Sequence, residues 1–596
     1  MKEKCGTCMD KIASELLVER LIDWGVDTVF GLPGDGINGI MEGMRRHAGR
    51  IRFILVHHEE AAAFMATGYA KSTGRLGVCL ATSGPGGIHL LNGLYDAKLD
   101  HAPVLALTGM QETQLLGTGY QQEVHLDRLF SDVVEYSAMV LTPAHIPTLV
   151  DLAVRHALAR RGVAHLTIPV DLQTAPADEA PPGGPAPARP PASAAVFFEA
   201  PKVPGPDELR RAAEVLNAGE KVVILAGAGA LGAREELLAV ADQLASPIVK
   251  TLPGKAAVPD DHPLTTGGIG LLGTKASDEA MEGADTLFMV GTNFPYTKFL
   301  PKPNQVNVVQ IEVDPTRAGV RIPTAVPLVG AAKETLGALS PMLSRNESRK
   351  FLAGIQAAMN KWRANMASLG NDTRDPIQPQ RLMAVIDRLA ANDAILTSDS
   401  GTIATWAARN FTVREQREFY LSGNLATMAP GMPYAIGMQV AHPGRQCIAF
   451  VGDGGFSMLM AEVLTAVGHD LPVKVFICNN GALAQILWEQ MVLGYPEFGV
   501  REPAVGEFAS FASANGALGI RVEKQEELEE AVGSALAHPG VAVVDVLVNP
   551  DEPPMPASVS YDQAKGFAQA FLRGQPRRST IASTLFRDRL SILRGD

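Results

Sequence analysis

Cysteine is scarce in this sequence, with five in 596 residues, and so few cysteines do not build a disulfide framework. Cys79, Cys447 and Cys478 lie in apolar, strand-like runs, so we expect them to be buried as small hydrophobic residues. Cys5 and Cys8 form a single CxxC pair near the N-terminus, and no second pair completes the roughly four ligands of a zinc site. The cysteines therefore predict neither a disulfide-rich protein nor a metal site.

Long apolar runs and basic residues are also in short supply. No run approaches the roughly 20 apolar residues of a membrane span, and the charged N-terminus is unlike a secretory signal. Lys and Arg total 52 against 64 Asp and Glu, for a net charge of −12, which argues against a nucleic-acid partner. With 46% hydrophobic residues the chain has the composition of a globular protein, its length predicts three or four domains, and we expect it in the cytoplasm.

The most informative stretch begins with an apolar run at 447–451, which predicts a buried parallel strand. A Gly-Asp-Gly-Gly turn follows at 452–455, and residues 456–467 have the apolar periodicity of a helix. A second buried run at 473–478 ends in two asparagines. Together these elements predict one right-handed crossover unit with polar residues at the carboxyl ends of neighbouring strands, where open α/β sheets bind ligands.

This turn suits a diphosphate that is held through a divalent cation. Gly454 and Gly455 would let the backbone approach phosphate, and the helix start offers free N–H donors. Asp453 and Asn480 supply hard oxygen ligands, which suit Mg²⁺ better than Zn²⁺. Taken alone, each motif is also compatible with a tight turn or a strand cap, and it is the combination that favours a cofactor site.

Strands and helices alternate along the whole chain, which predicts an α/β protein built from three doubly wound parallel sheets. A Pro- and Ala-rich stretch is typical of a semi-rigid linker. The first and third sheets are expected to share one architecture. The predicted division is an N-terminal domain at 1–173, a linker at 174–200, a central domain at 201–345, a connecting helix and linker at 346–379, a third domain at 380–560 and a C-terminal tail at 561–596.

With these motifs the chain resembles the thiamine-diphosphate family of acetolactate synthase and pyruvate oxidase, and most closely its bacterial quinone-dependent pyruvate oxidases. The resemblance rests on the Gly-Asp-Gly turn, on the segments at 119–123 and 291–296, and on the tail motif at 563–567. It implies a pyrimidine-binding first domain, an FAD-type central domain and a diphosphate- and Mg²⁺-binding third domain. It covers nearly the whole chain and specifies fold and cofactor better than substrate.

The resemblance implies catalytic roles for Glu59, Gln122 and Met428. Glu59 would hydrogen-bond the aminopyrimidine of thiamine diphosphate and let the cofactor deprotonate its own C2; the alternative is an acid that stabilises a helix start. Met428 would hold the cofactor bent, although methionine is more often core packing. The implied cofactor contacts are Gly34, Ser400, Gly401, Thr402, Met428, Asp453, Gly454, Gly455 and Asn480, and the implied metal ligands are Asp453, Asn480 and the main-chain carbonyl of Ala482.

In the central domain the resemblance implies FAD contacts, although relatives without flavin retain such a domain. Glu312 stands where the family usually has Asp, and Thr297 where the nearest relatives have Arg. In this family the cofactor lies between two chains, so a homodimer or homotetramer is implied. The candidate FAD contacts are Gly227, Gly229, Thr251, Gly254, Lys255, Gly270, Gly273, Asn293, Phe294, Glu312 and Asp314.

Three residues are expected in the substrate pocket: Gln121, Gln485 and Ile486. The two glutamines replace apolar residues of the relatives. Because an unpaired buried amide is costly, they indicate a donor or acceptor more polar than pyruvate, unless water satisfies both amides.

The tail from Arg573 onward is basic, and Leu585, Phe586, Leu590 and Leu593 fall roughly on one helical face. This pattern predicts an amphipathic helix that either contacts a membrane peripherally or docks on its own subunit.

The expected function is decarboxylation of a 2-oxo acid such as pyruvate, with oxidation of the enamine intermediate through FAD. Carboligation to a second carbonyl compound, as in acetolactate synthase, is the first alternative. A non-catalytic cofactor-binding protein is the second, and Glu59 argues against it.

Overall fold

The computed structural model describes residues 10–177, 194–502, 506–557 and 560–594. In these residues the chain forms three six-stranded sheets in which every strand pair is parallel. The predicted α/β class with three parallel sheets is therefore confirmed. The Cys5–Cys8 pair and most of the predicted linker lie outside the described residues.

The first sheet has the strand order β2-β1-β3-β4-β6-β5. Its strands are β1 Thr28–Gly31, β2 Arg52–Leu55, β3 Gly77–Ala81, β4 Val104–Met110, β5 Val134–Met139 and β6 Val163–Pro169. Its helices are α1 Ala13–Asp23, α2 Asn38–Arg46, α3 Glu59–Thr73, α4 Pro85–His89, α5 Leu91–Leu99, α6 Leu126–Leu129, α7 Ile146–Arg160 and α8 Val170–Gln173. β3 and β4 are buried along their whole length, which explains why they read as continuous apolar runs.

The central sheet has the order β12-β11-β10-β7-β8-β9. Its strands are β7 Val222–Ala226, β8 Ile248–Lys250, β9 Thr265–Gly268, β10 Thr286–Val290, β11 Asn307–Glu312 and β12 Val326–Val329. The accompanying helices are α9 Pro206–Ala218, α10 Arg234–Gln243, α11 Lys275–Gly283, α12 Ala332–Leu339 and the long α13 Lys350–Gly370.

The third sheet has the order β14-β13-β15-β16-β18-β17. Its strands are β13 Ile395–Ser398, β14 Glu418–Leu421, β15 Cys447–Gly452, β16 Lys474–Asn479, β17 Leu518–Val522 and β18 Ala542–Leu547. Its helices are α14 Pro379–Leu389, α15 Thr402–Asn410, α16 Gly431–Ala441, α17 Asp453–Met458, α18 Glu462–Gly468, α19 Ala484–Val492, α20 Phe508–Ala514 and α21 Leu528–Ala537. This order repeats that of the first sheet strand for strand, so the two sheets share one topology.

One predicted helix is wrong in its extent. Residues 456–467 do not form a single helix, because α17 ends at Met458 and α18 starts at Glu462. Leu459 breaks the helix with φ −128° and ψ 28°. Phe456 and Val463 are both buried in one core cluster, so the apolar spacing continues across the break and hides it from a periodicity argument.

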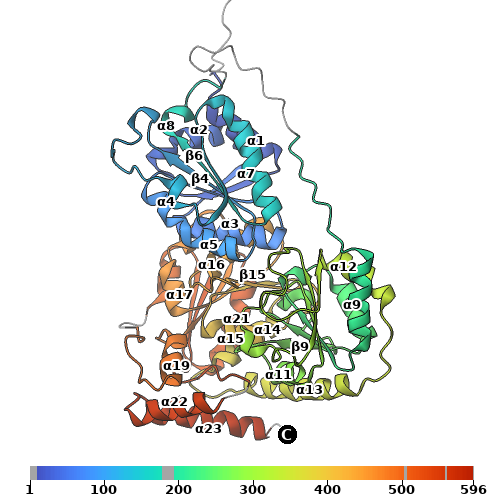
Figure 1. Cartoon of the computed structure of the whole chain (residues 1–596). Coiled ribbons are helices and arrows are strands. Elements are labelled where there is room, and N and C mark those ends of the chain that lie inside the picture. The colour runs from blue at the N-terminus through green and yellow to red at the C-terminus, as the bar shows by residue number, and fades with distance from the viewer. Residues whose placement is uncertain (1–9, 178–193, 503–505, 558–559, 595–596) are drawn as a thin grey trace, which may run out of the picture.

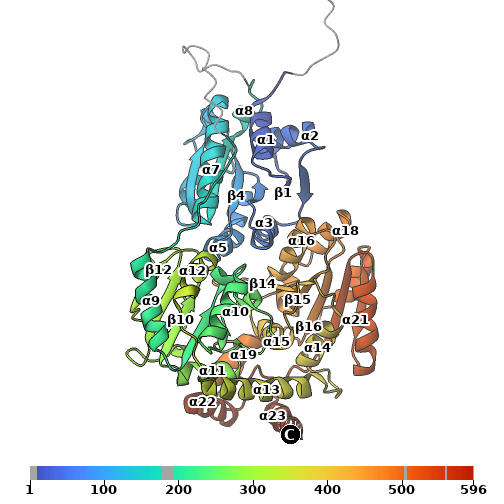
Figure 2. The same ribbon diagram turned by 90° about the vertical axis from the view of Figure 1, so that its right-hand side faces the viewer.

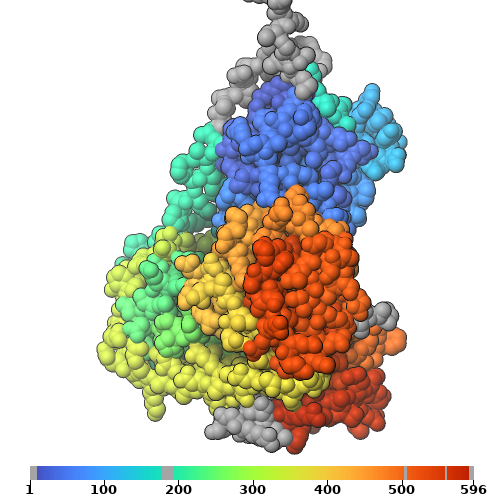
Figure 3. Space-filling model, turned by 180° about the vertical axis from the view of Figure 1, so that it is seen from behind, coloured from blue at the N-terminus to red at the C-terminus, as the bar shows by residue number. Residues whose placement is uncertain are grey.

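The first and third sheets meet through α3 and α16, whose labels lie together between the two domains in Figures 1 and 2. A Cβ added to Gly68 would lie 2.9 Å from Tyr434 Cα, and one added to Gly437 would lie 2.2 Å from the Met65 carbonyl oxygen. The pairing runs in opposite directions along the two helices, so they pack antiparallel at a separation that only glycine allows. In the space-filling view the first domain, in blue, lies directly on the third, in orange (Figure 3).

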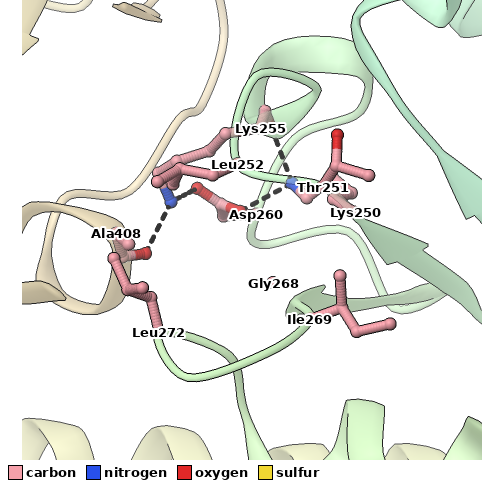
Figure 4. A pocket seen from close by; sticks show the side chains of 9 residues that line it. All are labelled: Lys250, Thr251, Leu252, Lys255, Asp260, Gly268, Ile269, Leu272 and Ala408. Carbon is pink, nitrogen blue, oxygen red and sulfur yellow. Dashed lines mark hydrogen bonds and ion pairs between the residues drawn. The ribbon is translucent and has the colours of Figure 1, made fainter. Parts of the chain in front are cut away.

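The central and third domains are joined by a buried cluster of charges (Figure 4). Asp260 accepts from Lys250 Nζ at 2.6 Å and from Lys255 Nζ at 2.7 Å. Its carboxylate also accepts from the Val413 N–H, and Lys255 Nζ donates to the carbonyl of Ala408 in α15. Burial lowers the pKa of Lys250 to about 8, and the charge of Asp260 opposes that shift.

The tail forms two helices, α22 Tyr561–Leu572 and α23 Arg578–Arg594, which lie beneath α13 and α19 at the bottom of Figure 1. Phe567 stacks on Trp488 of α19 with ring centroids 6.2 Å apart, and Ile581 is fully buried. Asp588 binds Arg374 at 3.0 Å. The predicted tail helix is present and docked on its own subunit, whereas peripheral membrane contact stays a prediction; the side chains of residues 589–594 lie outside the described part.

A search of the helices in the described residues finds none with the length and apolarity to cross a membrane.

The charge cluster predicts that removing the charge of Asp260 destabilises the protein far more than removing the charge of its neighbour Asp261. Asp260→Asn leaves two buried ammonium groups without a counter-charge, so we expect a loss of about 3–5 kcal/mol in the free energy of unfolding. The control is Asp261→Asn, since Asp261 is exposed and should change stability by no more than about 0.5 kcal/mol. Urea unfolding followed by fluorescence measures both. Equal shifts in the two variants would contradict the assigned role of the cluster.

Candidate active site

Glu59 is the first residue of α3 and is only 6% exposed. The residue before it, His58, has extended backbone, and its Nδ1 caps the helix by accepting from the Glu60 N–H at 3.2 Å. His89 Nδ1 donates to Glu59 Oε2 at 2.9 Å. The fold thus holds one carboxylate at a helix start with one hydrogen-bonded partner, which suits a group that exchanges a proton with a ligand.

Ligand atoms of His58, Glu59 and His89 lie within 4.8 Å of one another. His58 Nδ1 already accepts a backbone hydrogen bond, which leaves its proton on Nε2. The trio is therefore organised by hydrogen bonds, and we assign no metal to it.

The glycines and amides around Glu59 form a tight cradle. A Cβ on Gly34 would lie 2.6 Å from Thr82 Cβ, and one on Gly86 would lie 3.3 Å from Glu59 Oε1. Gln122 adopts a left-handed φ of 61° and accepts from Ser83 Oγ at 3.4 Å. Such backbone strain in a non-glycine residue is typical of functional loops. Gln121, next to it, is exposed.

Asp453 and Asn480 lie side by side at the carboxyl ends of β15 and β16, since Gly452 pairs with Cys478 in the sheet. Asp453 Oδ2 accepts from the Gly481 N–H at 2.7 Å, and Asn480 Oδ1 accepts from the Ala482 N–H at 3.0 Å. Burial raises the pKa of Asp453 to about 6, with backbone donors opposing and Glu502 adding to the shift. The two side chains and the 481–482 backbone form one oxygen-rich turn, as the motif predicted.

A third carboxylate, which the sequence did not single out, lies behind this turn. Asp399 is 2% exposed, and a Cβ on Gly455 would lie 2.0 Å from its Oδ2. One oxygen accepts from the Gly431 N–H at 2.7 Å, while Oδ2 is buried without a partner among the described residues. Burial raises the pKa of Asp399 to about 7. A buried orphan oxygen beside a glycine turn fits a site at which a ligand or ion supplies the missing partner.

Met428 and the loop after β13 surround the same turn. A Cβ on Gly454 would lie 3.5 Å from Met428 Cε, so the methionine does approach the predicted diphosphate loop. Gly401 has φ +113°, which favours glycine, and Thr402 starts α15. Ser400 N–H donates to the Thr427 carbonyl at 3.4 Å. The structure therefore brings Met428 close to the glycine turn and joins the loop at 400–402 to the segment that carries Met428.

Helix α19 lines this region as well. A Cβ on Gly401 would lie 3.9 Å from Gln485 Cβ, and Ile486 is 46% exposed. Gln485 Nε2 donates to Glu489 Oε1 at 2.9 Å, so its amide already has a partner. Glu502, which no motif marked, places Oε1 at 3.6 Å from a Cβ on Gly454. Its sequence neighbourhood gave no signal; only the fold brings it to the turn.

The FAD candidates of the central domain lie at the carboxyl ends of its strands, but several glycines have an internal reason to be glycine. A Cβ on Gly229 would lie 2.7 Å from Gly291 Cα, and one on Gly254 would lie 2.7 Å from Gly227 Cα. Gly273 packs in the same way against residues 268–270. These close approaches hold the loops together whether or not a ligand binds.

The polar candidates of this domain divide into two groups. Lys255 is committed to Asp260, and Glu312 Oε1 accepts from the Val313 N–H at 2.9 Å. Asp314 caps its own turn through Thr316. Asn293 differs, because its Oδ1 is buried without a partner among the described residues. The remaining candidates in these loops are Thr251, Gly270 and Phe294, and Thr251 and Phe294 are buried.

No hydrogen bond or ion pair between Glu59 and the Asp453 turn occurs within the described part of the chain. Exposed apolar side chains flank both groups, with Ile88 at 43% beside Glu59's partner His89 and Met458 at 62% in α17. One chain thus presents two separate groups of candidate residues, one around Glu59 and one around the Asp453 turn, which we call the half-sites. Each has an exposed apolar side chain next to it.

Comparison with known proteins assigns each domain. Residues 12–129 match the thiamine pyrophosphate enzyme N-terminal TPP binding domain, residues 209–339 the central domain of these enzymes and residues 399–546 their C-terminal TPP binding domain. Each match falls on one of the three sheets: the first covers β1–β4, the central one covers β7–β12, and the third begins directly after β13 and reaches β18.

Whole-chain relatives agree with this assignment. YdaP of Bacillus subtilis, whose name describes it as a thiamine pyrophosphate-containing protein, is 40% identical over 563 residues, which is 94% of this chain and 96% of that protein. A pyruvate oxidase of Lactiplantibacillus plantarum is 33% identical and covers 94% and 92% of the two chains. The large subunit of acetolactate synthase isozyme 3 of Escherichia coli is 31% identical and covers 92% and 96%. The chain therefore belongs to the thiamine-pyrophosphate-dependent enzymes, in the family that includes pyruvate oxidase and acetolactate synthase.

Proposed function

We propose that the protein decarboxylates a 2-oxo acid, pyruvate in the simplest case, with thiamine diphosphate and Mg²⁺, and that the substrate-derived electrons leave through FAD. Support comes from the family, from the relative named pyruvate oxidase and from the chemistry of the half-sites. Bound thiamine diphosphate supplies a nucleophilic carbon that adds to the carbonyl of a 2-oxo acid.

The third-domain turn fits a metal-bound diphosphate. Asp453 and Asn480 offer side-chain oxygens at one edge of the sheet, and the Ala482 carbonyl would add a backbone ligand. Oxygen-only ligand sets favour Mg²⁺. The unpartnered Asp399 Oδ2 behind Gly455 is the local sign that this turn receives a ligand.

Glu59 would hold or release a proton at the aminopyrimidine of the cofactor. Its burial excludes water, and the hydrogen bond from His89 fixes one of its two oxygens, which leaves the other free for the ligand. Gln122 and its strained backbone lie on the same cradle, and Met428 gives an apolar support at the facing half-site.

Acids near the third-domain turn do not decide between oxidation and carboligation, and the observation that carries oxidation through FAD is the buried Asn293 Oδ1, which lacks a partner among the described residues. Glu502 lies beside Gly454, and Glu489 is joined to Gln485 on α19. Arg501, on the same segment as Glu502, is committed to Glu497 with two contacts of 2.9 Å. The donor 2-oxo acid and a 2-oxo acid acceptor each carry a carboxylate, so like-charge repulsion from Glu502 and Glu489 would act on both.

The expectation of a donor or acceptor more polar than pyruvate depended on Gln121 and Gln485 being buried and unpaired. The amide of Gln485 is already paired with Glu489, and Gln121 is exposed. Neither amide is therefore both buried and unpaired, so the two glutamines do not require a donor more polar than pyruvate. We retain pyruvate as the simplest donor.

FAD in the central domain is supported by Asn293. Its buried Oδ1 lacks a partner among the described residues, in a loop at the carboxyl end of β10 that also carries Phe294. A ligand donor would satisfy this oxygen. Glycines 227, 229 and 254 are explained by close packing and add no support.

A second copy of the chain would complete each site. Glu59 and the Asp453 turn are both needed around one cofactor, and the flanking side chains of Ile88 and Met458 are exposed in one chain. A homodimer that joins Glu59 of one copy to the turn of the other covers this surface, and a homotetramer repeats the arrangement.

Cofactor binding should depend on the metal. Titration calorimetry is expected to detect thiamine diphosphate binding with Mg²⁺ and none in chelator-treated protein, because two phosphates cannot be held by backbone donors beside Asp453 without a cation. Asp453→Ala should abolish binding, and Asp453→Asn, which keeps an oxygen but loses the charge, should bind weakly. Tight metal-free binding would contradict the assigned turn.

Adjacent carboxylates should behave differently in proton exchange. Glu59→Gln should keep cofactor binding but slow exchange of the C2 proton about 10²–10⁴-fold, because an amide cannot transfer the proton. Glu60→Gln is the matched control, since Glu60 binds Asn92 instead. NMR exchange rates measure both, and equal rates in the two variants would remove Glu59 from its role.

Anaerobic addition of pyruvate tests the overall reaction. Flavin absorbance should bleach in the wild type and not in Glu59→Gln. Acetolactate formation without bleaching would instead support carboligation, and the absence of both products from a cofactor-loaded protein would support a non-catalytic binding role.

A further inference from the structure

The turn that precedes Glu59 is held by the third domain. Glu462, the first residue of α18, is fully buried. Its Oε1 accepts the backbone N–H groups of both His57 and His58, each at 3.0 Å. These are the two residues immediately before Glu59.

The other oxygen of Glu462 is fixed as well. Oε2 accepts from Thr465 Oγ1 at 2.6 Å, and Thr465 Oγ1 in turn accepts from His57 Nδ1 at 3.0 Å. Burial raises the pKa of Glu462 to about 7, whereas the Thr465 hydroxyl and the two backbone N–H groups oppose the shift. Three of these four contacts involve His57 or His58 and the fourth fixes the carboxylate within α18, so the carboxylate acts as a fixed template for the backbone of the turn.

The turn controls the direction of the Glu59 side chain. His58 is the N-cap of α3, with φ −147° and ψ 137°, and its ring caps the Glu60 N–H. A shift of the His57 and His58 N–H groups would rotate this cap and with it the first residue of the helix. Misplacement of a catalytic group by about 1 Å can cost roughly 10²-fold in rate.

We propose that Glu462 is a positioning residue for Glu59: a buried carboxylate of the third domain fixes, through two backbone hydrogen bonds, the catalytic acid of the first. The inference rests on the proton-exchange role proposed for Glu59. It assigns to the contact between the domains a task in catalysis in addition to cohesion.

His469 offers a matched control at the same contact. Its Nε2 accepts from the Leu55 N–H at 2.9 Å, so it also joins the third domain to the β2 end of the first, but on the strand side of the turn. His469→Leu removes one interdomain hydrogen bond without touching the donors next to Glu59.

The first measurement uses cofactor-free protein. Hydrogen–deuterium exchange in overlapping peptides should show the His57 and His58 amides exchanging about tenfold faster or more in Glu462→Met. Glu462→Gln keeps an acceptor oxygen and should stay near the wild type. His469→Leu should expose the Leu55 amide only.

The second measurement separates positioning from stability. C2 proton exchange, counted per bound thiamine diphosphate, should fall about tenfold or more in Glu462→Met and recover in Glu462→Gln. It should be unchanged in His469→Leu. If Glu462→Met does not fold, Glu462→Asp replaces it, because it withdraws the carboxylate by one methylene. C2 exchange should then fall in Glu462→Asp and stay near the wild-type rate in Glu462→Gln.

Two outcomes would overturn the proposal in distinguishable ways. Faster amide exchange with C2 exchange within about twofold of wild type would make Glu462 a purely structural tie. C2 exchange at the wild-type rate in Glu59→Gln, measured in parallel, would show that Glu59 does not have the proposed role. The amide exchange data would then describe only the hydrogen bonds between Glu462 and the turn at 57–58.

Discussion

The close antiparallel packing of α3 against α16 is the contact on which the rest of the molecule depends. Gly68 and Gly437 bring each backbone against the other helix, at distances that a methyl group would not permit. α3 begins at Glu59, and α16 follows Met428 by three residues. The same helix pair that joins two domains therefore also sets the positions of Glu59 and Met428. Loss of close packing here would cost function as well as cohesion.

Repetition of one topology explains where the two half-sites lie. The first and third sheets have the same strand order, and both present their polar loops at carboxyl strand ends. The repeated fold carries different groups on each copy, with a buried glutamate on one and an oxygen-rich turn on the other. Under the proposed function both groups act around one cofactor, and because each domain carries only one of them, the proposal includes two chains that share their sites.

Charges at the domain junctions differ in character from those at the sites. Lys250 and Lys255 are both paired with Asp260, and the two oxygens of Glu462 are both occupied. In contrast, Asp399 Oδ2 and Asn293 Oδ1 are buried with no partner in the described residues. Buried polar groups are costly when unpaired, and a bound ligand would satisfy these two atoms, although a buried oxygen of Asp96 at the contact of α3 with α16 also lacks a partner among the described residues.

The sequence by itself determined the α/β class, most central strands and the pairing of Asp453 with Asn480, because buried parallel strands read as apolar runs and the turns that end them are short. It did not determine the break at Leu459, since apolar spacing continues across it. The edge strand β14 was not predicted, because it has only four residues and is only partly buried, so its apolar pattern is weak. Glu462, Asp399 and Glu502 were found only in three dimensions, because each acts on residues distant in the chain and carries no local motif. A contact between domains leaves no periodicity in either partner, and only the tertiary structure decided it.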